Sequence, residues 1–158
     1  MDADAIDFVI AAWREDGLWQ VSRLPKRNAA DARTLITALR AHPAEAGVLG
    51  LISIAEEFFV IVRVDGARIR YLLSDLEAAI DWPLAADVLD ELGLPVPDLD
   101  DLDDVTPAGD LTLLADLGMP ATELAILTED IELYPDEVLS AVAARLGFAD
   151  QFDDLLEP

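Results

Sequence analysis

Two apolar segments near the N-terminus predict a β-hairpin. Residues 6–13 are rich in apolar, β-prone side chains, and polar and apolar side chains alternate along residues 18–23. Both patterns are typical of β-strands. Between them, Glu15-Asp16-Gly17 supplies turn residues, and glycine adopts positive φ angles without steric cost. We therefore expect the first two strands to pair in antiparallel fashion.

Three further apolar segments predict a meander of antiparallel strands. Polar residues separate the first segment from the second, and Asp65-Gly66 separates the second from the third. An Asp-Gly pair between two apolar segments is among the strongest short-range hairpin signals. The predicted strands cover residues 48–54, 58–64 and 69–73.

Amphipathic spacing predicts a helix between the hairpin and the meander, over about residues 29–41. Asn28 is a suitable N-cap residue, and His42-Pro43 ends the pattern, because a proline disfavours helical geometry at the preceding residue. The apolar side chains at the i, i+3, i+4, i+7 spacing of one helix face are Ala32, Leu35, Ile36 and Leu39.

A second helical region is expected after the meander. Ser74 is a suitable N-cap residue, and Asp75 and Glu77 place negative charge in the first turn, where the helix dipole favours it. Pro83 interrupts this helix, because its ring restricts the preceding residue. The helical segment after the proline ends at Gly93, a typical residue just beyond a helix C-terminus.

The element order ββα-βββ-α predicts an α+β fold. Short connections imply a five-stranded antiparallel sheet, complete before residue 74 and covered by helices. Residues 1–93 are expected to form a two-layer α+β domain. Residues 94–109 contain three prolines and five aspartates and are expected to form a linker. We expect residues 110–158 to form an acidic C-terminal segment of short helices without strands, packed on or beside the first domain and ending in an amphipathic turn or a frayed tail.

Charge is distributed unevenly along the 158 residues, which carry a formal net charge of −23. Residues 1–73 contain nine basic and ten acidic residues, a net of −1, whereas residues 74–158 contain one basic and 23 acidic residues, a net of −22. A field of that sign repels phosphate backbones and attracts basic protein surfaces. We therefore expect no direct nucleic-acid binding and a basic protein partner, although acidic residues also confer solubility without any partner. These charges do not exclude a homo-oligomer.

Composition predicts a folded protein and excludes several kinds of active site. Hydrophobic residues make up 53% of the chain, which favours a substantial core. The absence of cysteine excludes disulfides, thiolate nucleophiles and cysteine-ligated zinc, and the single histidine excludes multi-histidine metal sites. Neither phosphate-binding glycine motif occurs. We expect no metal and no cofactor, and apolar segments too short to span a membrane predict a soluble, cytoplasmic protein.

Three side chains outside these patterns have ordinary structural explanations. His42 lies at the end of a predicted helix, where a favourable interaction with the helix dipole explains it better than a role as general base. Trp13 and Trp19 flank the first turn, where cross-strand packing is the usual explanation. Exposure of either indole would instead indicate a contact surface.

Five aspartates cluster in the predicted linker. They invite a calcium site, but an EF-hand loop needs glycine at its sixth position and glutamate at its twelfth. Counted from the first aspartate of the cluster, those positions hold Asp103 and Gly109. We therefore favour a solvated acidic linker and regard its carboxylates as candidate partner-binding residues. They are Asp98, Asp100, Asp101, Asp103 and Asp104.

Three arginines of the meander form a candidate basic patch. Arg68 and Arg70 are two residues apart, so both point to the same face of their strand. Arg63 is expected to join them from across the Asp65-Gly66 turn. A solvent face paired with nearby carboxylates is the favoured interpretation, and a site for an anionic ligand is the alternative.

Four segments, taken in order, resemble a known family. They are FFVIVRVD (58–65), YLLSD (71–75), PAGDLTLLADLG (107–118) and YPDE (134–137). Together they resemble the actinobacterial tRNA adenosine deaminase-associated proteins, over about residues 5–152. That family is named for lying beside a tRNA adenosine deaminase in the genome, so the resemblance implies a partner and carries over no catalytic residue. A zinc deaminase itself needs an H-x-E and a P-C-x-x-C motif, which a chain without cysteine does not have.

These observations favour a noncatalytic, acidic accessory or regulatory protein. Charge predicts a basic partner, and the resemblance implies that this partner is the tRNA adenosine deaminase. One alternative is an orphan enzyme or small-ligand domain that uses Arg63, Arg68 and Arg70 for an anionic ligand. Another is a genomic neighbour with an unrelated function and no contact with the deaminase.

Overall fold

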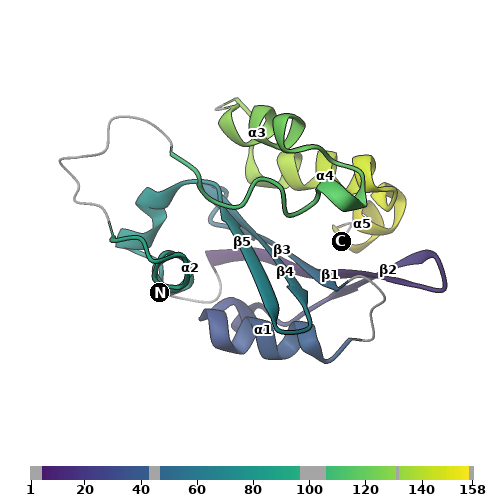
Figure 1. The fold of residues 1–158 in the computed structure, drawn as a ribbon, viewed down its shortest axis with the longest axis horizontal. Coiled ribbons are helices and arrows are strands. Elements are labelled where there is room, and N and C mark those ends of the chain that lie inside the picture. The colour runs from purple at the N-terminus through teal and green to yellow at the C-terminus, as the bar shows by residue number, and fades with distance from the viewer. Residues whose placement is uncertain (1–4, 43–46, 97–105, 131, 157–158) are drawn as a thin grey trace.

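A six-stranded antiparallel sheet forms the centre of the molecule (Figure 1). This computed structural model describes residues 5–42, 47–96, 106–130 and 132–156. The strand order is β2-β1-β3-β4-β5-β6. The strands are β1 (Ile6–Glu15), β2 (Leu18–Arg23), β3 (Val48–Ile54), β4 (Phe58–Asp65), β5 (Arg68–Leu73) and β6 (Ala108–Gly109). The α+β class, the antiparallel sheet and the positions of its first five strands are as predicted.

The sixth strand was not predicted, so the expected total of five strands is wrong. Strand β6 has two residues, and it pairs with the end of β5 through Leu72 opposite Gly109 and Leu73 opposite Ala108. The backbone N–H of Asp110 extends this pairing by donating to the carbonyl of Tyr71 at 2.9 Å. Two residues show no alternation of polarity, so the open edge of β5, rather than a local pattern, determines this strand.

Helices α1 (Ala32–Arg40) and α2 (Pro83–Leu92) pack on one face of the sheet. Two short 3₁₀ helices, η2 (Lys26–Ala29) and η3 (Leu76–Ile80), accompany them. Apolar residues of these helices share one core cluster with side chains of β1, β3, β4 and β5. Helix α2 begins at Pro83, and Gly93 follows it with a φ of +74°, as the sequence predicted.

The opposite face of the sheet carries the C-terminal helices, which lie above it in Figure 1. These are η5 (Ala115–Leu117), α3 (Ala121–Glu129), α4 (Pro135–Leu146) and α5 (Ala149–Leu156). The residues of the expected tail thus form an ordered helix, and Phe152 at its centre is fully buried against Phe8 of β1. Strand β3 is buried at every position, since helices cover both faces. None of the helices in the described ranges is long and apolar enough to cross a bilayer.

Two predicted helix caps are placed differently in the structure. Residues 26–29 form η2, and Asp31 instead caps α1, its carboxylate accepting the N–H of Thr34 at 2.8 Å. Asp75 caps η3 by accepting the N–H of Glu77. The hydroxyl of Ser74 accepts the N–H of Phe59 at 2.9 Å. Asp31 and Asp75 both have the extended backbone conformation that an N-cap requires.

Candidate functional site

Arg63 is buried, so it does not form an exposed patch with the other two arginines. Its side chain is only 2% exposed. The guanidinium forms an ion pair with Asp116 and donates to the carbonyl of Leu113 at 2.9 Å. A second nitrogen donates to the other carboxylate oxygen of Asp116, also at 2.9 Å. Arg63 therefore joins η5 and the segment just before it to the sheet.

Arg68 and Arg70 share a sheet face with Arg63 but remain more exposed. Arg70 lies directly opposite Arg63 in the β4–β5 register, and it is half-buried, whereas Arg68 is exposed. Both lower the pKa of Asp110, after the larger effect of the hydrogen bond that this carboxylate accepts from the Thr112 hydroxyl. The face is thus an arginine surface interleaved with carboxylates. Because Arg63 is committed to internal partners, this geometry argues against the anionic-ligand alternative.

His42 stacks on Trp13, with ring centroids 4.4 Å apart and an interplanar angle of 23°. Burial lowers the pKa of His42 from 6.5. The helix dipole would act in the opposite direction, so the dipole explanation of His42 stays a prediction, and the contact that the structure shows is the stack on Trp13. The neutral imidazole is the form that fits this position.

The stability of the fold is therefore expected to fall as pH drops below about 6.5, because the folded state binds the proton of His42 more weakly than the unfolded chain does. This stabilisation is complete above pH 6.5 and is lost as pH falls through the lowered pKa. NMR titration of the imidazole gives that pKa directly, and urea unfolding across this range gives the slope. The His42→Gln variant is the control. If its stability falls with pH as steeply as that of the wild type, the loss of stability comes from carboxylates and not from His42.

The two tryptophans of the first hairpin belong to opposite layers, and the predicted cross-strand packing is confirmed for Trp19, because the Arg14 guanidinium lies 4.9 Å from the centre of its ring. In the β1–β2 register Trp13 lies opposite Gln20, and Arg14 lies opposite Trp19. The Trp19 indole packs on Phe148 and donates to the carbonyl of Leu146 at 3.0 Å. This tryptophan therefore joins the hairpin to the C-terminal helices.

The candidate partner-binding aspartates of the linker, Asp98, Asp100, Asp101, Asp103 and Asp104, lie outside the described residues. The chain is described again from Thr106, whose carbonyl accepts the N–H of Leu76 at 2.8 Å. Because Leu76 begins η3, the end of the predicted linker lies beside that short helix.

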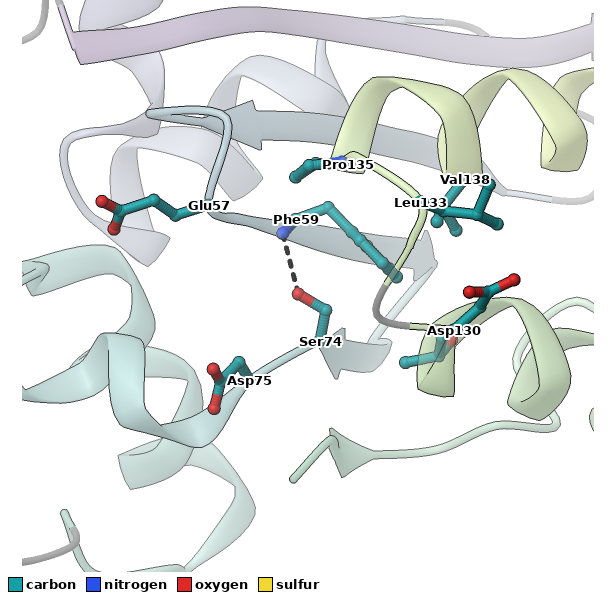
Figure 2. Close-up of a pocket in the computed structure, with 9 residues that line it drawn as sticks. Glu57, Phe59, Ser74, Asp75, Asp130, Leu133, Pro135 and Val138 are labelled. Atoms are coloured by element: carbon teal, nitrogen blue, oxygen red, sulfur yellow. Dashed lines mark hydrogen bonds between the residues drawn. The ribbon is translucent and has the colours of Figure 1, made fainter. Parts of the chain in front are cut away.

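A hollow opens near η3, between Ser74 and the loop that precedes α4 (Figure 2). Its volume is about 120 Å³, and its apolar walls include Phe59, Leu133 and Val138. Figure 2 shows Glu57 and Asp75 on one side of it and Asp130 on the other. The hydroxyl-bearing residues Ser74 and Thr128 complete the polar lining.

A second hollow adjoins the first and shares two of its residues, Glu57 and Asp75. It has a volume of about 170 Å³ and is also lined by Glu77, Asp81 and Trp82. We call the two hollows together the acidic groove. Its carboxylates belong to Glu57, Asp75, Glu77, Asp81 and Asp130.

The lining of the acidic groove combines carboxylates, two hydroxyls and apolar side chains. Its described lining contains no histidine, lysine or arginine. Within the described ranges, no three histidine or acidic side chains come close enough together to hold a metal ion. The groove was not predicted, because Asp75 and Glu77 are explained by helix capping and only the fold brings Asp130 into the same lining as Asp75.

The C-terminal helices present an acidic surface with two exposed apolar side chains, Ile126 (70% exposed) and Tyr134 (58% exposed). Arg145 is the only basic residue of residues 74–158. Its Nε donates to both carboxylate oxygens of Glu123, at 3.0 and 2.9 Å. The one positive charge of this half is thus neutralised locally.

Comparison with known proteins gives one family. A family model described as Rv3753c-like tRNA adenosine deaminase-associated protein matches residues 7–149. Protein Rv3753c of Mycobacterium tuberculosis is 40% identical over 158 residues, covering 98% of this chain and 91% of that protein. No solved structure matches the chain.

Proposed function

Because the chain belongs to the Rv3753c-like tRNA adenosine deaminase-associated protein family, we propose that it is a noncatalytic, acidic accessory protein that binds a basic surface of a tRNA adenosine deaminase in the cytoplasm. The family description supports the identity of the partner. The chemistry of the chain supports the manner of binding.

The observation that carries this proposal is the separation of charge along the chain. Residues 74–158 hold a net charge of −22, and from residue 110 onward the described part of this half folds mainly into helices on one face of the sheet. Its single arginine is paired with Glu123. A protein surface that attracts tRNA is basic and is therefore also attracted to these helices.

A noncatalytic role is supported by the side chains that the chain lacks. Without cysteine and with one histidine, it does not supply the zinc ligands of a nucleobase deaminase. The one imidazole is stacked on Trp13, and among the described residues no serine or threonine hydroxyl is hydrogen-bonded to it. The accessory protein would then act by occupying the basic surface, in competition with tRNA.

Association with the deaminase is expected to slow steeply as salt is added, because ions screen charges separated by more than about 10 Å at 0.1 M salt. Dissociation should change less, since it depends on short-range packing. Replacing the five linker aspartates by asparagine removes five charges and should give slower association with a shallower salt dependence. Surface-based binding kinetics at several salt concentrations measure both rates, with tRNA as competitor.

Each result of this experiment separates two hypotheses. The absence of binding at low salt would refute the deaminase as partner and favour a genomic neighbour with an unrelated function. Binding that does not depend on salt would retain the partner and refute the electrostatic mechanism. Binding that tRNA does not reduce would show that the two acidic ligands use different surfaces.

A further inference from the structure

Strand β2 forms one edge of the sheet, and no strand of the described residues lies on its outer side (Figure 1). We propose that two copies of this chain pair along this edge, β2 against β2 in antiparallel orientation, and that this symmetric dimer joins their two sheets. The inference goes beyond the proposed function and does not depend on which protein is the partner. The direction of the backbone groups, the composition of the strand and its symmetry about Val21 each support a second copy as the occupant.

Three residues of β2 direct their backbone groups away from the sheet. The two-residue turn at Asp16-Gly17 places Glu15 opposite Leu18, and such a pair exchanges both N–H···O bonds. The N–H of Leu24 likewise donates to the carbonyl of Val9 at 2.8 Å. Hydrogen-bonded positions alternate along an antiparallel strand, so the even-numbered residues of this strand face β1. The outward N–H and C=O groups are therefore those of Trp19, Val21 and Arg23.

This edge lacks the features that usually keep strands of different molecules apart. Natural edge strands are commonly protected by proline, by lysine, by a β-bulge or by a covering segment. Strand β2 contains neither proline nor lysine, and its register with β1 is uninterrupted from Leu18 to Arg23. Helix α5 lies over one face of the strand, where the Arg23 side chain donates to the carbonyl of Leu155 at 3.3 Å. The backbone hydrogen bonds of the described residues outside the strands do not include the outward groups of β2.

The sequence of the strand is self-complementary about Val21. In a two-fold pairing centred on this residue, position 18 of one copy lies opposite position 24 of the other, and position 19 lies opposite position 23. Leu18, which is 67% exposed, then packs on the half-buried Leu24 of the second copy. Arg23 lies opposite Trp19, so that no two like charges face each other. The same register pairs all the outward backbone groups.

Charge favours a second copy over a basic segment at this edge. Strand β2 carries one arginine and no acidic residue, so it lacks the carboxylates that would attract a basic partner. Pairing through β2 brings together the halves of net charge −1 rather than those of net charge −22. The whole chains still repel each other, because each carries a net charge of −23. The dimer is therefore expected to strengthen as salt is added, whereas binding to a basic protein weakens.

Sedimentation equilibrium of the full chain measures this dimer. A contact between two edge strands buries less surface than a standard interface, so we expect a weak dimer that requires chain concentrations up to about 1 mM. At about 0.5 M salt, which screens the repulsion between the chains, the average mass should rise with concentration towards twice that of one chain. A chain that stays monomeric under these conditions would overturn the proposal. A dimer that weakens as salt is added would do so as well.

A matched pair of variants tests which surface the dimer uses. Leu18→Glu and Ile126→Glu each replace an exposed apolar side chain, 67% and 70% exposed respectively, and they change the net charge equally. Only Leu18 lies at the β2 edge. Leu18→Glu should weaken the dimer at least about tenfold, because it places a carboxylate against Leu24 of the second copy, and Ile126→Glu should change it by less than about twofold. Equal losses in the two variants would refute pairing through β2.

Val21→Pro removes an outward N–H group and no hydrogen bond within the chain, and an edge strand tolerates proline at such a position. This variant should keep the circular dichroism spectrum of the wild type and lose the dimer. A folded proline variant that still dimerises would show that β2 is not the interface. Where this variant does not fold, the comparison of Leu18→Glu with Ile126→Glu decides.

Val21→Cys tests the register, since the natural chain contains no cysteine. In the pairing centred on this position, the two Cα atoms lie about 5.5 Å apart, within the range that a disulfide spans. Under mild oxidation Val21→Cys should form a disulfide-linked dimer at least about tenfold faster than Ile126→Cys, whose cysteine lies on α3 and meets a second copy only by random collision. Equal rates in the two variants would refute the register.

Discussion

Replacing Gly109 by alanine is expected to lower the free energy of unfolding by about 4 kcal/mol or more, at the upper end of single-substitution effects. Gly109 has a φ of +125°, and a Cβ added there would lie 2.1 Å from the carbonyl oxygen of Tyr71 and 2.9 Å from its carbon. Both atoms belong to the backbone of β5, which is fixed within the sheet. Strand β6 would have to separate from β5, which breaks the pairing at Leu72 and Leu73. Urea unfolding followed by circular dichroism measures the loss.

Gly118 provides the matched control for this prediction. Its φ of +121° is almost the same, but a Cβ added there meets nothing within 4 Å. Gly118→Ala should therefore show only the cost of an unfavourable backbone conformation, about 1–3 kcal/mol. Equal losses in the two variants would mean that β6 shifts without consequence, and that its contact with β5 contributes little to stability.

Local patterns predicted the sheet well. Two of the three hairpin turns contain Asp-Gly, and β4 ends at Asp65 as the Asp65-Gly66 signal required. Proline and glycine marked the two ends of α2 for opposite reasons: Pro83 restricts the residue before it, whereas Gly93 adopts the positive φ angle that ends the helix. Where the backbone geometry depends on two or three adjacent residues, the sequence was sufficient to predict the end of a strand or helix.

Features that depend on contacts distant in the sequence were not predictable. Strand β6 exists because β5 offers an open edge, and Arg63 is buried because Asp116, 53 residues later, covers it. A single arginine in an otherwise apolar strand was read as exposed, although the apolar residues on both sides of it pointed equally well to a buried strand. The acidic groove likewise combines three segments of the chain.

The arginine surface and the acidic groove differ in what their charges are bound to. On the arginine face, Arg63 is neutralised within the molecule and lowers the pKa of Asp116 chiefly through its hydrogen bond to that carboxylate. In the groove, Asp75 and Asp130 each accept a hydrogen bond from a backbone N–H. Neither of the two ion pairs found among the described residues involves a groove carboxylate. Charges that the fold already pairs contribute to stability, and charges without a cationic partner remain for another molecule.

Replacing Arg63 by alanine is expected to lower the free energy of unfolding by about 3 kcal/mol, because it leaves a cavity and removes the donor to the carbonyl of Leu113. Arg63→Met fills most of that volume and should cost only about 1–2 kcal/mol, the cost of the orphaned carbonyl. Arg70→Ala, on the neighbouring strand and half-buried, is the matched control and should change stability by less than about 1 kcal/mol. Urea unfolding of the three variants gives these values.

The pKa of Asp116 supplies an independent measurement of the same interaction. Arg63 holds this pKa below 3.8, so the ion pair stabilises the folded state above that pH and the stabilisation is lost as pH falls through the lowered pKa. In Arg63→Met the pKa should return towards its ordinary value, and the acid-dependent part of stability should shrink. If the folded Met variant still binds the deaminase as the wild type does, Arg63 has a structural role. A folded Met variant that no longer binds would instead place Arg63 in the recognition surface and revive the anionic-ligand alternative.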